Sequence, residues 1–446
     1  MIDIAIVGSG PAGIDAAREA VKYGLTATLV GAMPPGGRAA MGSLLPSKVW
    51  LHEATRASAG TAVAPAAADA ITEEIRRTQG SWTSALAGEL EQLGVTFYRG
   101  TARLASSDTI TVHSPEDASV MDTIQARSIL LTTGSEPSFT PTVRPDGDRI
   151  IAPRHTQKLT EIPKHIVFTG GGVTGTEYAS AFARLGSTVE IFTRGDTLLR
   201  RGEPAAAGFL TDYLENELGV VIHRNQTVTY VSRKNGRVIT TSDVGTSVES
   251  DYAFIATGRH PDLSIIENAG AGLSDSFERD ENSRLRTDEF GQTSIAGIYV
   301  AGDAAGGILI ANKATWEARR AVRHIAGDDV RTLPEATWAV EAVYTDPQAA
   351  WVGDVQRLPA EETPEIGIHE RSYNRLLLAH IDHAEQGFFK VWYEKGSGAI
   401  LGASAAGSHA AELLTPVQMA MHQGLSVGRL NAIPAPHPTF SELVTH

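Results

Sequence analysis

The sequence predicts an α/β protein with two Rossmann-like dinucleotide-binding domains. Two observations carry this prediction. Glycines in G-x-G-x-x-G spacing occur in two separate strand–turn–helix–strand units, and strand patterns alternate with helical patterns, which is typical of parallel sheets. The chain has 446 residues, 42% of them hydrophobic, which suffices for two or three domains, because single cores stop growing near ~250–300 residues.

The first unit opens the chain, in DIAIVGSGPAGIDAAREAVKYGLTATLV. Gly8 allows the tight turn after the strand, Gly10 lets the backbone approach a diphosphate, and Gly13 lets the following helix pack closely. The diphosphate is then expected at the helix N-terminus, where backbone N–H groups have no partner within the helix. The complete unit predicts a dinucleotide site.

The same pattern recurs in HIVFTGGGVTGTEYASAFARLGSTVEIFTR, with Gly170, Gly172 and Gly175 at the same spacing. The chain is therefore expected to hold two dinucleotides. A flavin and a nicotinamide form the natural pair, because hydride must pass between two stacked rings.

The composition excludes several kinds of chemistry. The chain has no cysteine, so disulfides, thiolate nucleophiles and iron–sulfur clusters are excluded, and its histidines lack metal-ligand spacing. A formal net charge of -14 does not suit nucleic acid as a partner. The N-terminus resembles a strand rather than a signal peptide, and no apolar run approaches the ~20 residues of a membrane span. We expect a cytoplasmic protein without a membrane span or a metal site, whose redox chemistry comes from a cofactor.

The order of signals along the whole chain resembles the pyridine nucleotide–disulfide oxidoreductases, the family of dihydrolipoamide dehydrogenase and glutathione reductase. LLTTGSEP around Gly134 and FIATGRHPD around Gly258 look like the family's two A-T-G turns. Asp303, in GIYVAGDAAGG, matches the aspartate that binds the flavin's ribityl chain. VYTDPQAAWVG and PHPTFSE look like parts of the C-terminal dimerisation domain. The resemblance implies FAD and NADP (or NAD) as cofactors and a homodimer as the assembly.

The resemblance also implies a domain organisation and further cofactor positions. The expected domains are an FAD-binding domain in residues 1–150 and 266–333, an NAD(P)-binding domain in 151–265, and an α+β dimerisation domain in 334–446. The remaining expected cofactor-binding residues are Ala102, Val228 and Ala311.

The segment that carries the family's redox disulfide has lost both cysteines. The family pattern is close to GGTCLNVGCIPSK, and here GGRAAMGSLLPSK places Ala39 and Leu44 at the cysteine positions. Disulfide and dithiol substrates of the family mechanism are thereby excluded. Lys48 and Glu177 nevertheless match a lysine near flavin N5 and its glutamate partner. We interpret them as a catalytic pair whose cation favours the anionic reduced flavin, the alternative being a leftover surface pair.

The second unit also carries the choice of nicotinamide. Its second strand ends in Thr193 and Arg194 without a carboxylate, and TRGDTLLR resembles the arrangement of the NADPH-using glutathione reductases. Arg194 and Arg200 are then the ligands of a 2′-phosphate, which suits planar guanidinium groups. The alternative is a pair of ordinary surface arginines. We predict NADPH, without excluding NADH.

Two positions depart from the family pattern at the nucleotides. Gly31 stands where a glutamate usually binds the adenosine ribose of the flavin, which removes a charge-assisted hydrogen bond of about 1.5–3 kcal/mol. Val173 stands where a tyrosine commonly covers the flavin until nicotinamide displaces it. We expect weaker flavin retention and a more open nicotinamide pocket.

His437 and Glu442 have the spacing of the family's C-terminal dyad, in which the histidine reaches the partner subunit's flavin and exchanges protons with a thiol. Two interpretations remain, because no thiol is left. Either His437 protonates another acceptor while Glu442 orients it, or the pair is retained for dimer structure alone.

Together these features predict an FAD-dependent NAD(P)H oxidoreductase that passes hydride from NADPH to flavin and then reduces a small acceptor such as a quinone. The alternatives are a soluble transhydrogenase-like enzyme, a biosynthetic flavoenzyme and a non-catalytic flavin-binding sensor or scaffold. Small Ala39 and apolar Leu44 suit a planar, apolar acceptor.

Overall fold

The computed structural model describes residues 1–58, 67–270, 272–328, 330 and 338–445. The chain divides into two compact units. The first comprises Met1–Pro46, Glu74–Ser138 and Arg259–Ala336, and the second comprises Ser47–Glu73, Phe139–Gly258 and Thr337–His446. The domain boundary predicted at 333/334 lies outside the described residues. Within the described ranges, no helix is both long and apolar enough to cross a membrane.

The first unit is built on a seven-stranded sheet of order β3-β2-β1-β6-β5-β4, with β17 also paired to β6. The strands are β1 Ile2–Val7, β2 Ala27–Gly31, β3 Thr96–Arg99, β4 Thr101–Leu104, β5 Thr109–His113, β6 Val120–Leu131 and β17 Ile298–Val300. The long strand β6 pairs antiparallel with β5 along its first half and parallel with β1 and β17 along its second half. It thus joins the parallel core of the sheet to an antiparallel extension.

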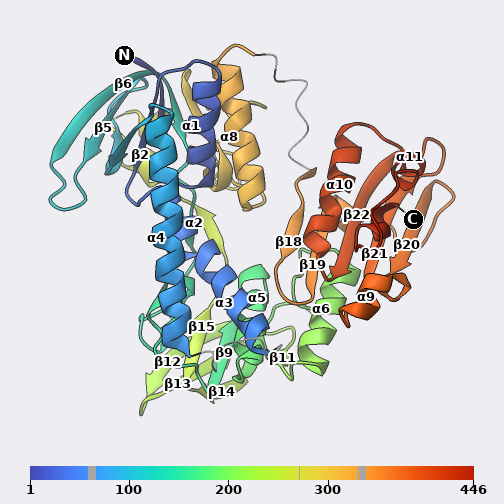
Figure 1. The fold of residues 1–446 in the computed structure, drawn as a ribbon. Helices are drawn as coiled ribbons and strands as arrows, with labels where there is room; N and C mark the ends of the chain where they lie inside the picture. Colours follow the sequence, from blue (N-terminus) through green and yellow to red (C-terminus); the bar gives the residue numbers. More distant parts are fainter. Residues whose placement is uncertain (59–66, 271, 329, 331–337, 446) are drawn as a thin grey trace. The chain divides into compact units, whose positions relative to one another are not determined.

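Strand β1 shows why this sheet is buried on both faces. Ile4 and Ile6 pack with helices α1 and α8, whereas Ala5 and Val7 pack into a second cluster on the opposite face. A continuous apolar run is what a parallel strand covered on both sides requires. Figure 1 shows α1 and α8 side by side along the sheet. The helices that begin in or enter this unit are α1 Pro11–Lys22, α2 Gly37–Gly42, α3 Leu44–Ser58, α4 Ala68–Gln92, α7 Ser264–Glu267 and α8 Ala311–Ile325.

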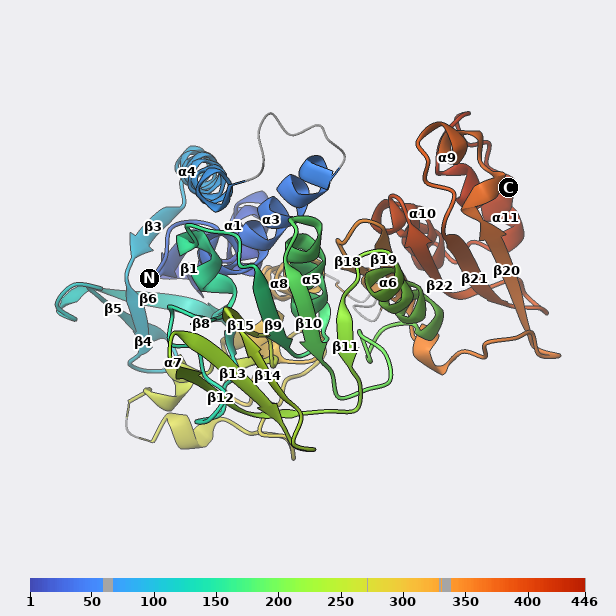
Figure 2. The same cartoon turned by 90° about the horizontal axis from the view of Figure 1, so that it is seen from below.

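The second unit contains a five-stranded, wholly parallel sheet of order β11-β10-β9-β15-β8. Its strands are β8 Ile150–Ile151, β9 His165–Thr169, β10 Thr188–Phe192, β11 Val221–His223 and β15 Tyr252–Ile255, and its helices are α5 Val173–Arg184 and α6 Pro204–Asn216. Figure 2 shows an antiparallel meander beside this sheet, formed by β12 Val228–Lys234, β13 Arg237–Ser242 and β14 Ser247–Ser250.

The C-terminal part of the second unit is an antiparallel sheet of order β18-β19-β22-β21-β20. Its strands are β18 Glu341–Val343, β19 Gln348–Gly353, β20 Ile366–Ser372, β21 Phe388–Glu394 and β22 Ile400–Gly407. Helix α10 Ala410–His422 covers β19 and β22, and the other helices are α9 Leu377–Ile381, α11 Val427–Asn431 and α12 Glu442–Thr445. Two helix-covered parallel sheets and an α+β C-terminal part confirm the predicted fold class.

Candidate cofactor and redox site

The first glycine turn forms a tight cradle between β1 and α1. Gly8 has φ +119°, and a β-carbon on Gly13 would lie 1.8 Å from the carbonyl oxygen of Gly8. A β-carbon on Gly10 would meet no described atom within 4 Å, and no described side chain caps the N-terminus of α1. The turn is thus closed where the backbone packs and open where a diphosphate would bind, so it fits a dinucleotide.

The second glycine turn repeats this geometry between β9 and α5. Gly170 has φ +102°, and a β-carbon on Gly175 would lie 2.0 Å from the carbonyl oxygen of Gly170. Gly172 precedes α5 with open space around its α-carbon and with no cap from any described side chain. This cradle also fits a dinucleotide diphosphate.

The two predicted A-T-G turns carry their glycines in left-handed conformations. Gly134 has φ +80° and Gly258 has φ +112°. Thr132, two residues before Gly134, donates its hydroxyl to the carbonyl oxygens of Val7 and Gly8, at 3.0 Å each. The A-T-G turn of the first unit is thereby tied directly to its glycine cradle.

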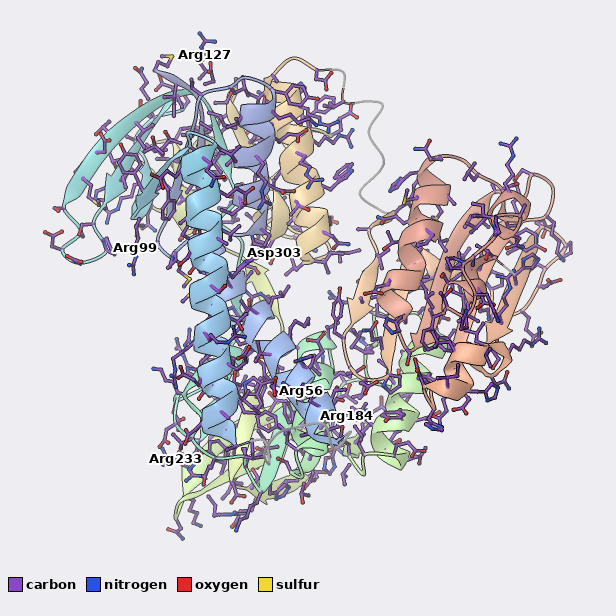
Figure 3. The ribbon with its side chains drawn as sticks, viewed as in Figure 1. Arg56, Arg99, Arg127, Arg184, Arg233 and Asp303 are labelled. Carbon is purple, nitrogen blue, oxygen red and sulfur yellow. The ribbon has the colours of Figure 1, made fainter. Side chains whose placement is uncertain are left out.

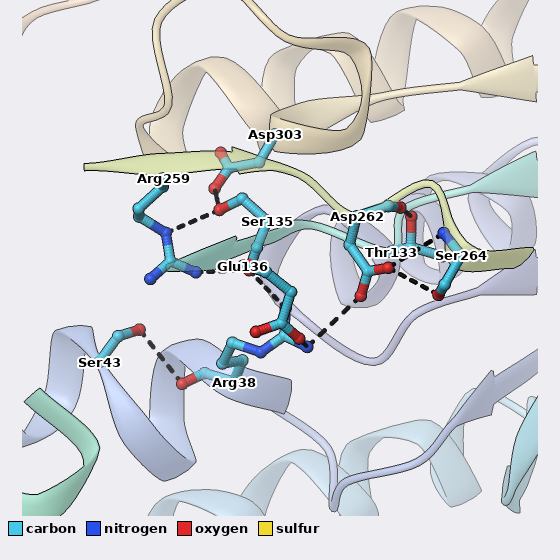
Figure 4. A network of polar contacts seen from close by, with 9 residues as sticks. All are labelled: Arg38, Ser43, Thr133, Ser135, Glu136, Arg259, Asp262, Ser264 and Asp303. Atoms are coloured by element: carbon cyan, nitrogen blue, oxygen red, sulfur yellow. Dashed lines mark hydrogen bonds and ion pairs between the residues drawn. The ribbon is translucent and has the colours of Figure 1, made fainter. Parts of the chain in front are cut away.

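Asp303 follows the carboxyl end of β17, in the short 3-10 helix Gly302–Ala305 (Figure 3). Its carboxylate accepts a hydrogen bond of 2.5 Å from the hydroxyl of Ser135. Arg259 donates to the same hydroxyl at 2.8 Å, and Arg38 donates to the carbonyl oxygen of Ser135 at 2.5 Å (Figure 4). Two arginines and the predicted ribityl ligand therefore meet at one serine.

Arg38, Ser135 and Arg259 were not predicted as site residues. Arg38 also pairs with Glu136 and lies 3.5 Å from Asp262, and burial lowers the pKa of Arg259. A signal was present in the sequence. Arg38 lies within GGRAAMGSLLPSK, the segment that has lost the family's two cysteines. Ser135 and Arg259 directly follow the glycines of the two A-T-G turns. What the sequence could not show is that these segments converge.

The three other cofactor positions lie in different settings. Ala311 begins α8, whose N-terminus no described side chain caps. Ala102 lies in β4 with its side chain in the core of the first unit, and Val228 begins β12 and packs against a small core cluster of the second unit. Their nucleotide contacts stay a prediction.

Lys48 and Glu177, which are 129 residues apart in the sequence, form an ion pair in the second unit. The Lys48 ammonium contacts both carboxylate oxygens, at 2.7 and 2.8 Å. Glu177 is on α5, one turn after Val173, and its side chain is only 3% exposed, whereas that of Lys48 is 32% exposed. The pair is therefore a buried carboxylate with a lysine at the surface, which differs from an ordinary surface pair.

Arg194 and Arg200 lie in the loop that follows β10. Both side chains are exposed, and the stem of Arg200 lies across Gly195, 3.2 Å from the place of its β-carbon. Neither guanidinium has a hydrogen-bond or ion-pair partner among the described residues. Arg224 in the same region, by contrast, is paired with Glu215. Two unpartnered cations at the end of the second strand leave charge available for a phosphate.

His437 and Glu442 are in contact, as the dyad spacing predicts. The histidine Nδ1 lies 3.0 Å from a Glu442 oxygen, and the other Glu442 oxygen accepts the backbone N–H of Thr439 at 2.8 Å. The imidazole is 63% exposed, while the carboxylate is 12% exposed. Glu442 thus holds one nitrogen of a histidine whose side chain is largely exposed.

The positions of the lost cysteines and of the missing tyrosine are open. Leu44 is exposed at the start of α3, Ala39 is half-buried in α2, and Val173 is exposed at the first position of α5. Whether the nicotinamide pocket is more open, and whether the face of the lost disulfide is roomier, stay predictions.

Comparison with known proteins assigns the chain to a family. The family described as "Pyridine nucleotide-disulphide oxidoreductase" matches residues 2–318, and its dimerisation domain matches residues 340–446. The chain belongs to this family. It is accordingly a flavin-dependent oxidoreductase by family, and the family's cofactors are FAD and NAD(P).

Named relatives match along nearly the whole chain. A dihydrolipoyl dehydrogenase of Halobacterium salinarum is 29% identical, over 99% of this chain and 94% of the relative. An NAD(P)H dehydrogenase (quinone) of Mycobacterium tuberculosis is 27% identical, over 99% and 92%. The crystal structure of LpdA from Mycobacterium tuberculosis matches with a TM-score of 0.90 and 25% identity, over 100% of this chain and 98% of that one.

Proposed function

We propose that this protein is an FAD-dependent NAD(P)H oxidoreductase that passes hydride from NADPH to flavin and then reduces a small acceptor such as a quinone. One combination carries the proposal. The two cradles and the Lys48–Glu177 pair are intact, while Ala39 and Leu44 stand at both positions of the family's redox disulfide. Nucleotide binding is thus retained without the thiols that a disulfide substrate needs.

The chain's own residues have defined tasks in this function. The first cradle binds the diphosphate of FAD, with Asp303 on the ribityl chain, and the second binds that of NADPH, with Arg194 and Arg200 on the 2′-phosphate. FAD supplies the two-electron chemistry when bound. Lys48, held by Glu177, supplies positive charge where negative charge develops during reduction. His437 of the partner subunit, oriented by Glu442, donates a proton to the acceptor.

The domain assignment follows from these tasks. We assign residues 1–150 and 266–333 to the flavin, residues 151–265 to the nicotinamide nucleotide, and residues 334–446 to the contact of a homodimer. The match of the dimerisation domain over residues 340–446 supports the last assignment.

The printed names of the relatives leave two acceptor classes to be distinguished. Several relatives are named dihydrolipoyl dehydrogenase, and relatives from Mycobacterium tuberculosis are named NAD(P)H dehydrogenase (quinone). The absence of cysteine in this chain favours the quinone. A non-catalytic flavoprotein is the second candidate, and Gly31 favours it because the site lacks a ribose carboxylate.

The test is turnover of the purified holoenzyme with NADPH or NADH and either 1,4-benzoquinone or oxidised lipoamide. We expect rapid quinone reduction and none of lipoamide. Glu177→Gln removes the charge that holds Lys48 and should lower kcat for the quinone by about tenfold or more. Reduction of lipoamide would overturn the acceptor assignment, and no reduction of either acceptor would favour the non-catalytic flavoprotein.

The role of His437 has a separate test, because a proton-donor role and a structural role in the dimer remain to be distinguished. His437→Ala is expected to slow quinone reduction while the dimer stays intact in sedimentation analysis. Unchanged turnover of an intact dimer would exclude the proton-donor role, and loss of the dimer would make the dyad structural.

A further inference from the structure

Tyr344 contacts both members of the Lys48–Glu177 pair. It lies in the connection between β18 and β19, in a different part of the second unit from α3 and α5. Its backbone N–H donates to Glu177 Oε1 at 3.1 Å, and the Lys48 Nζ lies 4.6 Å from the centroid of its ring. Three segments remote in sequence therefore meet at one ion pair.

The Glu177 carboxylate and the Lys48 ammonium are stabilised by different contacts. The Glu177 carboxylate is removed from water, so its charge depends on its donors, which are the Lys48 ammonium and the Tyr344 N–H. The ammonium is bound by the carboxylate and faces the electron-rich surface of the tyrosine ring. Displacing the ammonium would leave Glu177 as a buried charge whose remaining donor among the described residues is the Tyr344 N–H.

The tyrosine ring is suited to this contact over a wide pH range. Burial raises the pKa of the Tyr344 hydroxyl, and the negative charges of Glu177 and Glu412 act in the same direction. The ring therefore stays a neutral phenol at ordinary working pH. The residue is 46% exposed, and contact with solvent limits the strength of a cation–π contact.

We propose that Tyr344 is a positioning residue, whose ring holds the Lys48 ammonium against Glu177 and thereby fixes the positive charge that favours flavin reduction. This inference rests on the proposed function, in which Lys48 supplies that charge. It assigns a task in the redox reaction to the C-terminal part of the second unit that is separate from forming a dimer.

The side chain can be tested without disturbing the carboxylate's backbone donor. Tyr344→Leu removes the ring and keeps the N–H, whereas Tyr344→Phe keeps both the ring and the N–H. Tyr230 in β12, a similarly exposed tyrosine of the same unit, provides the matched control Tyr230→Leu. Lys48→Met removes the charge itself and reports whether that charge acts on the flavin at all.

The measurement is the equilibrium between the flavin of each holoenzyme and a redox dye of known potential. We expect Tyr344→Leu to lower the equilibrium constant for flavin reduction by about two- to fivefold, as the loss of an exposed cation–π contact predicts. Tyr344→Phe and Tyr230→Leu should match the wild type, and Lys48→Met should show a larger decrease than Tyr344→Leu. If Tyr344→Leu holds no flavin, Tyr344→Gln takes its place.

The outcomes separate the two levels of the argument. A decrease with Lys48→Met and none with Tyr344→Leu would overturn the role of Tyr344 and leave the proposed function standing. An equal decrease with Tyr344→Phe and Tyr344→Leu would assign the effect to the hydroxyl and would also overturn the ring's role. No decrease with Lys48→Met would overturn the charge assignment on which both depend.

Discussion

The two glycine cradles have the same turn geometry but differ in what fills the space between the turn and the end of the second strand. In the first cradle a turn side chain fills it, and in the second cradle side chains from beyond the turn do. In the first cradle, the side chain of Ser9 occupies the space between the turn and the end of β2, where a β-carbon on Gly31 would lie 2.4 Å from the Ser9 hydroxyl. In the second cradle, the corresponding turn residue is Gly171, and the side chains of Thr193, which directly follows β10, and Leu198 share the space; Leu198 Cδ2 would lie 2.7 Å from a β-carbon on Gly171. A β-carbon on Gly171 would lie 2.9 Å from the Thr193 hydroxyl.

This difference explains the missing carboxylate as part of a packing arrangement. The Ser9 hydroxyl lies 3.0 Å from the carbonyl oxygen of Met33 and 3.3 Å from that of Pro34, so it ties the loop after β2 to the turn. Gly31 leaves room for that side chain. In each cradle the glycine turn and the strand end thus leave little room for side chains on both. The residue type at the ribose-binding position therefore depends on the residue type in the turn.

The largest expected effect comes from a substitution that blocks the close helix packing of the second cradle and leaves the first cradle unchanged. Gly175→Ala would place a methyl group 2.0 Å from the Gly170 carbonyl oxygen, which backbone atoms cannot accommodate without moving. We expect at least about a 100-fold loss of NADPH affinity with flavin retained, measured by equilibrium titration.

The control for Gly175→Ala is Gly208→Ala, because Gly208 lies inside α6 and its β-carbon would meet no described atom within 4 Å. That variant should be neutral or slightly stabilised. Normal NADPH binding by Gly175→Ala would contradict the cradle assignment.

The next effect concerns the two arginines that follow the second strand of the second cradle. The double variant Arg194→Ala, Arg200→Ala is expected to raise the KM for NADPH by about tenfold or more and to change that for NADH little, because charge-assisted hydrogen bonds to the phosphate are lost. Steady-state kinetics with both nucleotides measures the difference. Arg201→Ala is the control, since Arg201 is an exposed arginine next in sequence. Equal effects on both nucleotides would exclude the 2′-phosphate contact.

A smaller effect should reveal the coupling of Ser9 and Gly31. Gly31→Glu alone is expected to lower both the melting temperature and FAD affinity, because the new side chain clashes with Ser9. Ser9→Gly combined with Gly31→Glu removes the clash and should bind FAD up to about tenfold more tightly than the wild type, through a restored ribose hydrogen bond. FAD titration of the apoprotein measures both. A single Gly31→Glu variant that binds FAD as well as the double variant would show that the two positions are independent.

The smallest effect is the mirror experiment in the second cradle. Gly171→Ser is expected to weaken NADPH binding a few-fold through contact with Thr193 and Leu198. Adding Thr193→Gly should restore part of the affinity, because the contact with Leu198 remains. A double-mutant cycle on NADPH affinity measures the coupling. Additive losses would mean that Thr193 does not occupy the shared space.

The sequence sufficed for the parts of the site that depend on local pattern. Gly10 and Gly172 could be predicted because the turn, its glycines and the helix are contiguous. The Lys48–Glu177 contact could be predicted only through family resemblance, since nothing local joins residues so far apart. The contact is confirmed as geometry, and its role stays a prediction.

Other contacts could not be predicted, because they depend on how strands end and segments converge. G-x-G-x-x-G leaves Ser9 unspecified, and its contact with Gly31 depends on which face the last residue of β2 presents. Arg38 and Arg259 belong to two different sequence segments of the first unit. They meet at Ser135 through the pairing of β7 (Ser135–Pro137) with β16 (Arg259–Pro261) and the placement of α2. Tyr344 likewise reaches Lys48 only through the tertiary fold.

The most direct test of the central claim is anaerobic rapid mixing of the holoenzyme with NADPH or NADH while the visible absorption of the flavin is followed. If the two cradles serve hydride transfer without a disulfide, the flavin bleaches rapidly, faster with NADPH, and no long-wavelength band of a thiolate–flavin charge-transfer complex appears. Protein that retains its flavin and is bleached by neither nucleotide would contradict the account.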